Sequence, residues 1–436
     1  MAALRFAPAS KGHNGKLEMK EKSVIRNLGF ACLGVTLCAS AALAQVTLER
    51  TNLNAGISTT VATSPAAWVY VSSTLLGGSV NEIEAFDAAP NGKLTAVPGS
   101  PFQENVTSMA VNGKYLFAVN SNGFDIDSYL LESNGALHYA ATTNASQPGD
   151  CNSLGSLVLD HTGATLYGMD FRGSGCSNNT FESFAVNRPT GGLKDFGNSS
   201  ANNWLYLPVS FIGNNVYAYT ASCLGDMYWG IFKFQRGSNG LLTEIDTNGA
   251  PPTPPMGYFY CPSQAAADPT NHVAITMQPV NQLNFNPDKR PQLATYTADA
   301  KGNLNTTSTA GNMPTTAVVS VTDTGMSPSG KLFAVGGTGG VQIFHFNGAS
   351  PITHYTGLLT TAEVDQLFWD NENHLYAIGT AANKLWVFTV TPTGYSQAPG
   401  SPYTINAPHN IIVQPLPRYA VSSGVEPIRV LLSSDE

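Results

Sequence analysis

Short apolar runs recur along the chain beyond residue 60, and none of them sustains the 3.6-residue period of a helix. They are rich in aromatic and β-branched residues and are punctuated by Gly, Asn and Pro, a pattern typical of short β-strands joined by turns. The clearest runs are WVYVSS (68–73), YLFAVN (115–120), TLYGMD (165–170), NVYAYT (215–220), HVAITM (272–277), KLFAVG (331–336) and HLYAIG (374–379). This pattern predicts an all-β protein.

A second apolar run follows each of the first, and one position in it is aromatic. These aromatic residues recur at intervals of about 50 residues and are Phe86, Tyr129, Phe184, Phe234, Tyr296, Phe344 and Phe388. Most of the second runs lead into a Gly-x-Leu turn, such as Gly135/Leu137, in which Gly supplies the positive φ of a tight hairpin. Seven units, each long enough for about four short strands, predict a single seven-bladed β-propeller.

The end of the repeat array indicates how the ring closes. A shorter strand precedes each first run, as TSMAV (107–111) does, and would line the central channel. The segment HNIIV (409–413) has no strand pair after it, so we expect it to complete the first blade. The closed ring is favoured over an open solenoid or two β-sandwiches. The predicted propeller spans 61–415, between a lead-in at 45–60 and a tail at 416–436.

The N-terminus has the features of a secretory signal peptide. Residues 28–44 carry no charge, Lys20, Lys22 and Arg26 precede them, and Ala42-Leu43-Ala44 closes the run. We expect 1–44 to be removed before Gln45, with Met19 as an alternative start. A membrane anchor or a lipoprotein at Cys38 is the less favoured alternative. The protein is therefore expected outside the cytoplasm, in the periplasm or the medium of a bacterium.

Composition limits the partners. The formal net charge is −8 with only 21 Lys and Arg, so we expect no nucleic-acid binding and no stable membrane insertion. Hydrophobic residues make up 42% of the chain, enough for a sizeable core. No phosphate-binding loop, G-x-S-x-G or H-E-x-x-H motif occurs, and we expect no cofactor. We expect the protein to be a monomer. Its expected partner is a small polar or sugar-like ligand, or an envelope protein.

Four cysteines follow the predicted signal peptide. Their even number in an exported chain suggests two disulfides, and their spacing matches no CxxC metal motif, so we expect no metal; a channel cation at Asp323 and Asp365 is the alternative that stays open. Of the three possible connectivities, only one keeps both links local in the predicted propeller. It pairs Cys151 with Cys176 and Cys223 with Cys261.

The strand and turn motifs resemble one known family. The YVxN-like runs, the Gly-x-Leu turns and the blocks VPGSPF (97–102) and APGSPY (398–403) are similar to those of lactonase-type seven-bladed propellers, which include 6-phosphogluconolactonase. The resemblance covers about 60–415 and implies the fold, with lactone hydrolysis as the associated activity. Family members commonly carry an Arg-His pair on a channel strand and an acidic residue after the next strand. Here Leu207-Pro208 and Ala221 hold the matching positions.

Alignment of the predicted channel strands places polar residues at the channel mouth. One position in each blade forms a register of Asn410, Ser108, Ser156, Pro208, Gln264, Asp323 and Gln366. The preceding register is His409, Thr107, Gly155, Leu207, Ser263, Thr322 and Asp365. Hydroxyls, amides and carboxylates suit a small polar ligand such as a sugar or lactone. The alternative is a hydrated channel without a ligand.

Two functions remain open: a noncatalytic ligand-binding propeller, or a hydrolase that opens a sugar lactone. In the second, His409 is the expected base and Asp365 orients it, while Asn410 or Gln366 donates to the developing oxyanion. Arg172 and Arg290 are the expected carboxylate or phosphate binders, because guanidinium matches these anions.

Overall fold

The computed structural model describes residues 64–74, 81–145, 154–170, 180–200, 208–224, 228–247 and 250–417. The chain divides into two units, 1–60 and 61–436. The predicted signal peptide, the lead-in and the tail from residue 418 lie outside the described residues. Within the described ranges no helix could cross a membrane.

Seven antiparallel sheets, here called blades, follow one another along the chain. Blade 1 contains β29 (Asn410–Pro415), β1 (Ala67–Thr74), β2 (Asn81–Ala88) and β3 (Leu94–Ala96). Blade 2 contains β4 (Val106–Val111), β5 (Tyr115–Asn120), β6 (Asp125–Leu131) and β7 (Leu137–Asn144). Blade 3 contains β8 (Leu154–Leu159), β9 (Thr165–Asp170), β10 (Thr180–Val186) and β11 (Leu193–Ser200).

The remaining blades have the same order of strands. Blade 4 contains β12 (Ser210–Phe211), β13 (Tyr217–Leu224), β14 (Tyr228–Arg236) and β15 (Leu242–Thr247), and blade 5 contains β16 (Tyr258–Ala267), β17 (His272–Asn281), β18 (Gln292–Ala298) and β19 (Leu304–Asn305). Blade 6 contains β20 (Ser320–Met326), β21 (Leu332–Thr338), β22 (Gly340–Asn347) and β23 (Ser350–Thr360). Blade 7 contains β24 (Gln366–Trp369), β25 (His374–Gly379), β26 (Lys384–Thr391) and β27 (Gly394–Gln397), with β28 (Tyr403–Thr404) paired to β26.

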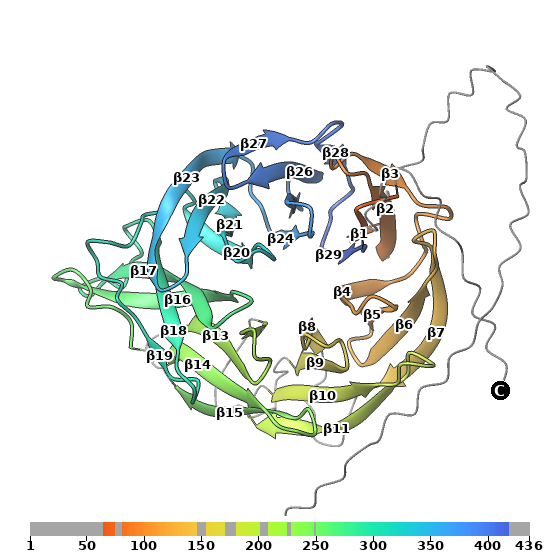
Figure 1. Cartoon of the computed structure of the whole chain (residues 1–436), viewed down its shortest axis with the longest axis horizontal. Coiled ribbons are helices and arrows are strands. Elements are labelled where there is room, and N and C mark those ends of the chain that lie inside the picture. Colours follow the sequence, from red (N-terminus) through yellow and green to blue (C-terminus); the bar gives the residue numbers. More distant parts are fainter. Residues whose placement is uncertain are drawn as a thin grey trace, which may run out of the picture. The chain divides into compact units, whose positions relative to one another are not determined.

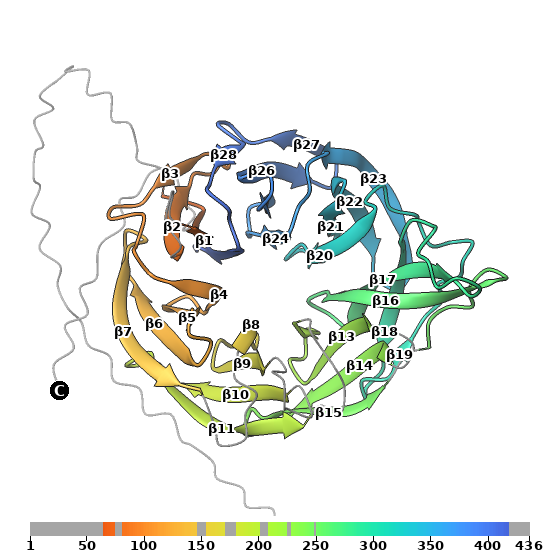
Figure 2. The same ribbon diagram turned by 180° about the vertical axis from the view of Figure 1, so that it is seen from behind.

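The blades form a propeller, with one strand of each nearest the central axis (Figures 1 and 2). These innermost strands are β29, β4, β8, β12, β16, β20 and β24. The described residues are β-strand or connecting loop, which confirms the predicted all-β, seven-bladed fold. Each predicted aromatic residue lies on the third strand from the axis, such as Phe344 on β22.

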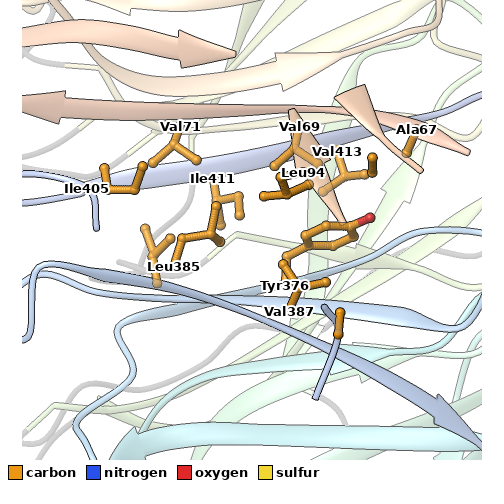
Figure 3. Close-up of a cluster of buried hydrophobic side chains, with 13 residues drawn as sticks. Ala67, Val69, Val71, Leu94, Tyr376, Leu385, Val387, Ile405, Ile411 and Val413 are labelled. Atoms are coloured by element: carbon orange, nitrogen blue, oxygen red, sulfur yellow. The ribbon is translucent and has the colours of Figure 1, made fainter. Parts of the chain in front are cut away.

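The hydrophobic core is divided among the interfaces between blades. Between blades 7 and 1, Val69 and Ile411 pack with Tyr376, Leu385 and Val387 (Figure 3). The described residues form seven such clusters, one at each interface. Because each blade is covered on both faces, its second strand is buried along most of its length, which explains the mainly apolar runs in the sequence.

The Gly-x-Leu turns pack against the preceding blade. At Gly302 the backbone has φ of 74°, and an added Cβ would lie 2.6 Å from the ring of Tyr217. The Tyr219 hydroxyl donates to the Gly302 carbonyl at 2.7 Å. Glycine is therefore required here both for the backbone conformation and for the close approach of two blades.

The ring closes as the sequence predicts. Strand β29 pairs antiparallel with β1, with Val413 opposite Val69 and Ile411 opposite Val71. The last strand of the chain thus joins the first blade, and Ile411 and Val413 are each 1% exposed. Without β29, β1 would present an unpaired edge to the channel.

Deletion of residues 408–436 is expected to destabilise the propeller far more than deletion of 418–436. The longer deletion removes β29 and with it two buried side chains, Ile411 and Val413, whose burial is worth roughly 1.5–3 kcal/mol each. We expect the melting temperature to fall by roughly 10 °C in the first variant and to change little in the second. Equal melting temperatures would contradict closure by β29.

Candidate functional site

A cavity of about 470 Å³ lies at the channel mouth, where the innermost strands begin. All seven residues of the first predicted register line it, together with five residues of the second. The lining is Thr107, Ser108, Leu154, Gly155, Ser156, Pro208, Gln264, Thr322, Asp323, Asp365, Gln366, His409 and Asn410. Leu207 lies outside the described residues, and Ser263 is not part of the lining. We call the first register the polar ring.

Bulges in the innermost strands accompany the polar ring. The ladder between β4 and β5 shifts register immediately before Ser108, and that between β20 and β21 shifts before Asp323. Similar shifts occur around Ser156 in β8 and Gln264 in β16. A bulge turns a strand locally and redirects its side chains. These irregularities therefore help to direct the ring residues into the cavity.

Most ring side chains also bridge to the innermost strand of the next blade. A backbone N–H of that strand donates to the side chain in four cases: Met109 to Asn410 (3.0 Å), Leu157 to Ser108 (3.1 Å), Leu367 to Asp323 (2.8 Å) and Ile411 to Gln366 (2.7 Å). Gln264 instead donates from Nε2 to the Thr322 carbonyl at 2.9 Å. The polar ring therefore has a structural role in addition to lining the cavity.

One amide of the ring keeps its donor capacity. Gln366 accepts through Oε1 from Ile411 N–H and from Asn410 Nδ2. Within the described part of the chain its Nε2 has no hydrogen-bond partner, although it lines the cavity. This amide is placed to donate to a carbonyl or hydroxyl oxygen of a ligand.

The Asp323 carboxyl, which lines the cavity, has a strongly raised pKa. Its two carboxylate oxygens accept from the backbone N–H groups of Thr324 and Leu367, each at 2.8 Å. These bonds favour the charged form, but desolvation within the channel outweighs them and raises the pKa from 3.8 to about 7. Asp323 also lines a second cavity of about 220 Å³, shared with Pro208 and Gln264. Asp323 thus borders both cavities.

His409 and Asp365 both line the cavity, but they do not contact each other. The Asp365 carboxylate accepts from Thr380 N–H at 2.6 Å, and His409 Nε2 bonds to the Thr74 hydroxyl at 2.7 Å. The expected orientation of His409 by Asp365 is therefore absent from this structure. Instead, the Asp365 carboxylate is hydrogen-bonded to a backbone amide of the β25–β26 turn, and the His409 imidazole is hydrogen-bonded to Thr74 of β1.

The predicted arginine and cysteine residues lie elsewhere or outside the described residues. Arg290 lines a separate pocket on blade 5. Cys223 of β13 and Cys261 of β16 form a disulfide with a Cα–Cα distance of 5.3 Å, which links blades 4 and 5. Arg172 and the predicted pair Cys151–Cys176 are outside the described residues. Among the described side chains, no group of three or more His, Cys, Asp or Glu could hold a metal ion.

Comparison with known proteins identifies the fold. A "putative 6-phosphogluconolactonase" from Bacteroides fragilis superposes with a TM-score of 0.57 at 13% identity, covering 81% of this chain and 99% of that chain. A protein of the same description from Bacteroides uniformis gives 0.56 at 13% identity, with 80% and 99% covered. No family model matches the sequence, and the search of curated proteins found no significant match.

The same fold also occurs in a protein with a different description. A hypothetical selenium-binding protein from Sulfolobus tokodaii superposes with a TM-score of 0.56 at 12% identity, covering 81% of this chain and 94% of that chain. The protein thus has the seven-bladed propeller architecture expected from its lactonase-like motifs. Its function must be argued from its own site.

The raised pKa of Asp323 should make stability depend on pH. The folded protein binds the Asp323 proton more tightly than the unfolded chain does. The stabilising contribution of Asp323 to the free energy of unfolding is therefore fully present below about pH 4 and is lost as the pH rises to about 7. Over this pH range we expect the free energy of unfolding of wild type to fall by about 2 kcal/mol relative to that of Asp323→Asn. This is roughly half of what the pKa shift would give in a dry interior, because the carboxyl faces an open cavity. Denaturant unfolding at several pH values measures the difference, and parallel curves for the two proteins would contradict it.

Proposed function

We propose that the channel-mouth cavity binds a small, neutral, polar ligand of the sugar or sugar-lactone class. The observation that carries this proposal is the convergence of the Gln366 donor and the Asp323 carboxyl in one cavity of about 470 Å³. A cavity of this size accommodates one small ring compound. Gly155 and Ser156, which also line the cavity, are small residues.

The charge of the lining favours a neutral ligand over a phosphorylated one. Two carboxyl groups, Asp323 and Asp365, line the cavity, and the described lining contains neither Lys nor Arg. A phosphate group would lose hydration there and gain no cation in return. A substrate like that in the name of the similar Bacteroides proteins is therefore disfavoured, whereas the unphosphorylated sugar or lactone suits the site.

Replacement of Gln366 by Glu tests the ligand site. Glu keeps the oxygen that accepts from Ile411 N–H but replaces the free Nε2 donor with an acceptor. At about pH 8, where Glu is ionised, we expect glucose or δ-gluconolactone to bind roughly tenfold more weakly, as judged by calorimetry.

Gln414→Glu provides the matched control, because Gln414 lies on β29 but outside the cavity lining. It adds the same charge and should bind like wild type. Glucose 6-phosphate should bind wild type more weakly than glucose does. Tighter binding of the phosphorylated sugar, or equal binding by both Gln→Glu variants, would contradict the proposal.

Hydrolysis of a neutral lactone is the second candidate function, and the pKa of Asp323 near 7 favours it. An ionised carboxylate with this pKa is suited to take a proton from water at neutral pH. The resulting hydroxide would add to the lactone carbonyl carbon while Gln366 Nε2 donates to the carbonyl oxygen. Cleavage of the ring C–O bond and protonation of the leaving oxygen would then yield the hydroxy acid.

His409 is the other candidate base, since Thr74 holds its Nε2 and its ring lines the cavity. We assign the base to Asp323, because the exposed imidazole has no carboxylate partner among the described residues. In a pH-stat assay of δ- and γ-lactones, turnover should rise through about pH 7 and fall roughly 10²–10⁴-fold in Asp323→Asn. His409→Ala should retain turnover; its loss there, with turnover kept in Asp323→Asn, would return the role to His409.

We also propose that the protein is exported. The apolar run at 28–44, with its basic flank and Ala-x-Ala ending, supports this location. The disulfide between Cys223 and Cys261 is consistent with it, because disulfides persist mainly in oxidising compartments.

A further inference from the structure

Blade 5 carries a second pocket that is separate from the channel mouth. It has a volume of about 340 Å³ and shares no lining residue with the channel-mouth cavity. Two cationic side chains, Lys289 and Arg290, line it together with Gln292 and Thr315. Both cations come from the segment between β17 and β18, which is longer than a tight hairpin.

Neither cation is neutralised by an ion pair within the described part of the chain. Lys289 Nζ lies 3.8 Å from the centre of the Tyr258 ring, and one guanidinium nitrogen of Arg290 donates to the Ala317 carbonyl at 3.1 Å. Asp288, the adjacent carboxylate, accepts from the Tyr258 hydroxyl and from Asn281 Nδ2, each at 3.2 Å. The remaining guanidinium N–H groups and the ammonium group are therefore available to an anion.

The frame around these cations is held by specific contacts. Gln292 accepts from the Tyr260 hydroxyl at 2.6 Å and donates to the carbonyls of Ala310 and Met313. Pro255 and Pro279 form part of the wall. The cation–π contact with Tyr258 positions Lys289 without neutralising it. A site whose frame is already ordered loses less entropy when a ligand binds.

We propose that the blade-5 pocket binds an anionic group, a carboxylate or a phosphate. Arg290 offers paired N–H groups that match either anion, and Lys289 adds a second positive charge. The chain as a whole has a formal net charge of −8, whereas this pocket brings two cations together. The pocket and the channel mouth have opposite charge preferences, and this inference does not rest on the proposed function of the mouth.

The double variant Lys289→Ala/Arg290→Ala tests the pocket, with inorganic phosphate and citrate as separate probes in calorimetry. Loss of both cations should weaken the binding of the recognised anion about tenfold or more. Binding of phosphate alone, or of citrate alone, identifies which anion the pocket recognises. Circular dichroism should show unchanged folding, because both side chains are exposed.

The matched control is Lys331→Ala/Arg188→Ala. Lys331 and Arg188 are exposed, and Arg188, like Arg290, donates to one backbone carbonyl. This control removes the same charge elsewhere and should bind the anion like wild type. Equal weakening in both double variants, or no binding of either probe by wild type, would overturn the proposal.

Discussion

The unpaired inner edge of the innermost strands is the constraint on which the rest of this structure depends. Each of these strands has a neighbour within its blade on one side only, so its other N–H and C=O groups face the channel. Ring side chains satisfy several of them from the adjacent blade, as Asn410 does for Met109 N–H and Asp323 for Leu367 N–H. The same residues therefore join the blades and line the cavity.

This double role limits which residues of the polar ring can still bind a ligand. A ring amide that already serves a backbone group has less capacity left for a ligand, whereas Gln366 keeps its Nε2 and Asp323 keeps a titratable carboxyl. The Leu367 N–H donates to Asp323, and Leu367 follows Gln366 directly, so the two functional groups are tied to one backbone segment at the interface of blades 6 and 7. The two side chains that we propose contact a ligand, Gln366 and Asp323, thus lie on one side of the polar ring.

Charge is also distributed unevenly over the propeller. The described lining of the channel mouth contains two carboxyl groups and neither Lys nor Arg, while Lys289 and Arg290 lie in a pocket of blade 5. The disulfide between Cys223 and Cys261 links this blade to blade 4. A repeated fold thus carries differently charged surfaces on different blades, because loops and ring positions vary while the interface cores keep the blades in place.

The sequence by itself determined the all-β class, the seven blades, the closing strand and the membership of the polar ring. These features follow from local patterns: apolar runs, glycine turns and a repeat that aligns equivalent positions. Only the tertiary structure decided that Thr74 rather than Asp365 holds His409, that Arg290 lies away from the mouth, and that Asp323 has a pKa near 7. Those outcomes depend on distances between blades and on desolvation in the channel, which residues far apart in the sequence create together and no local pattern encodes.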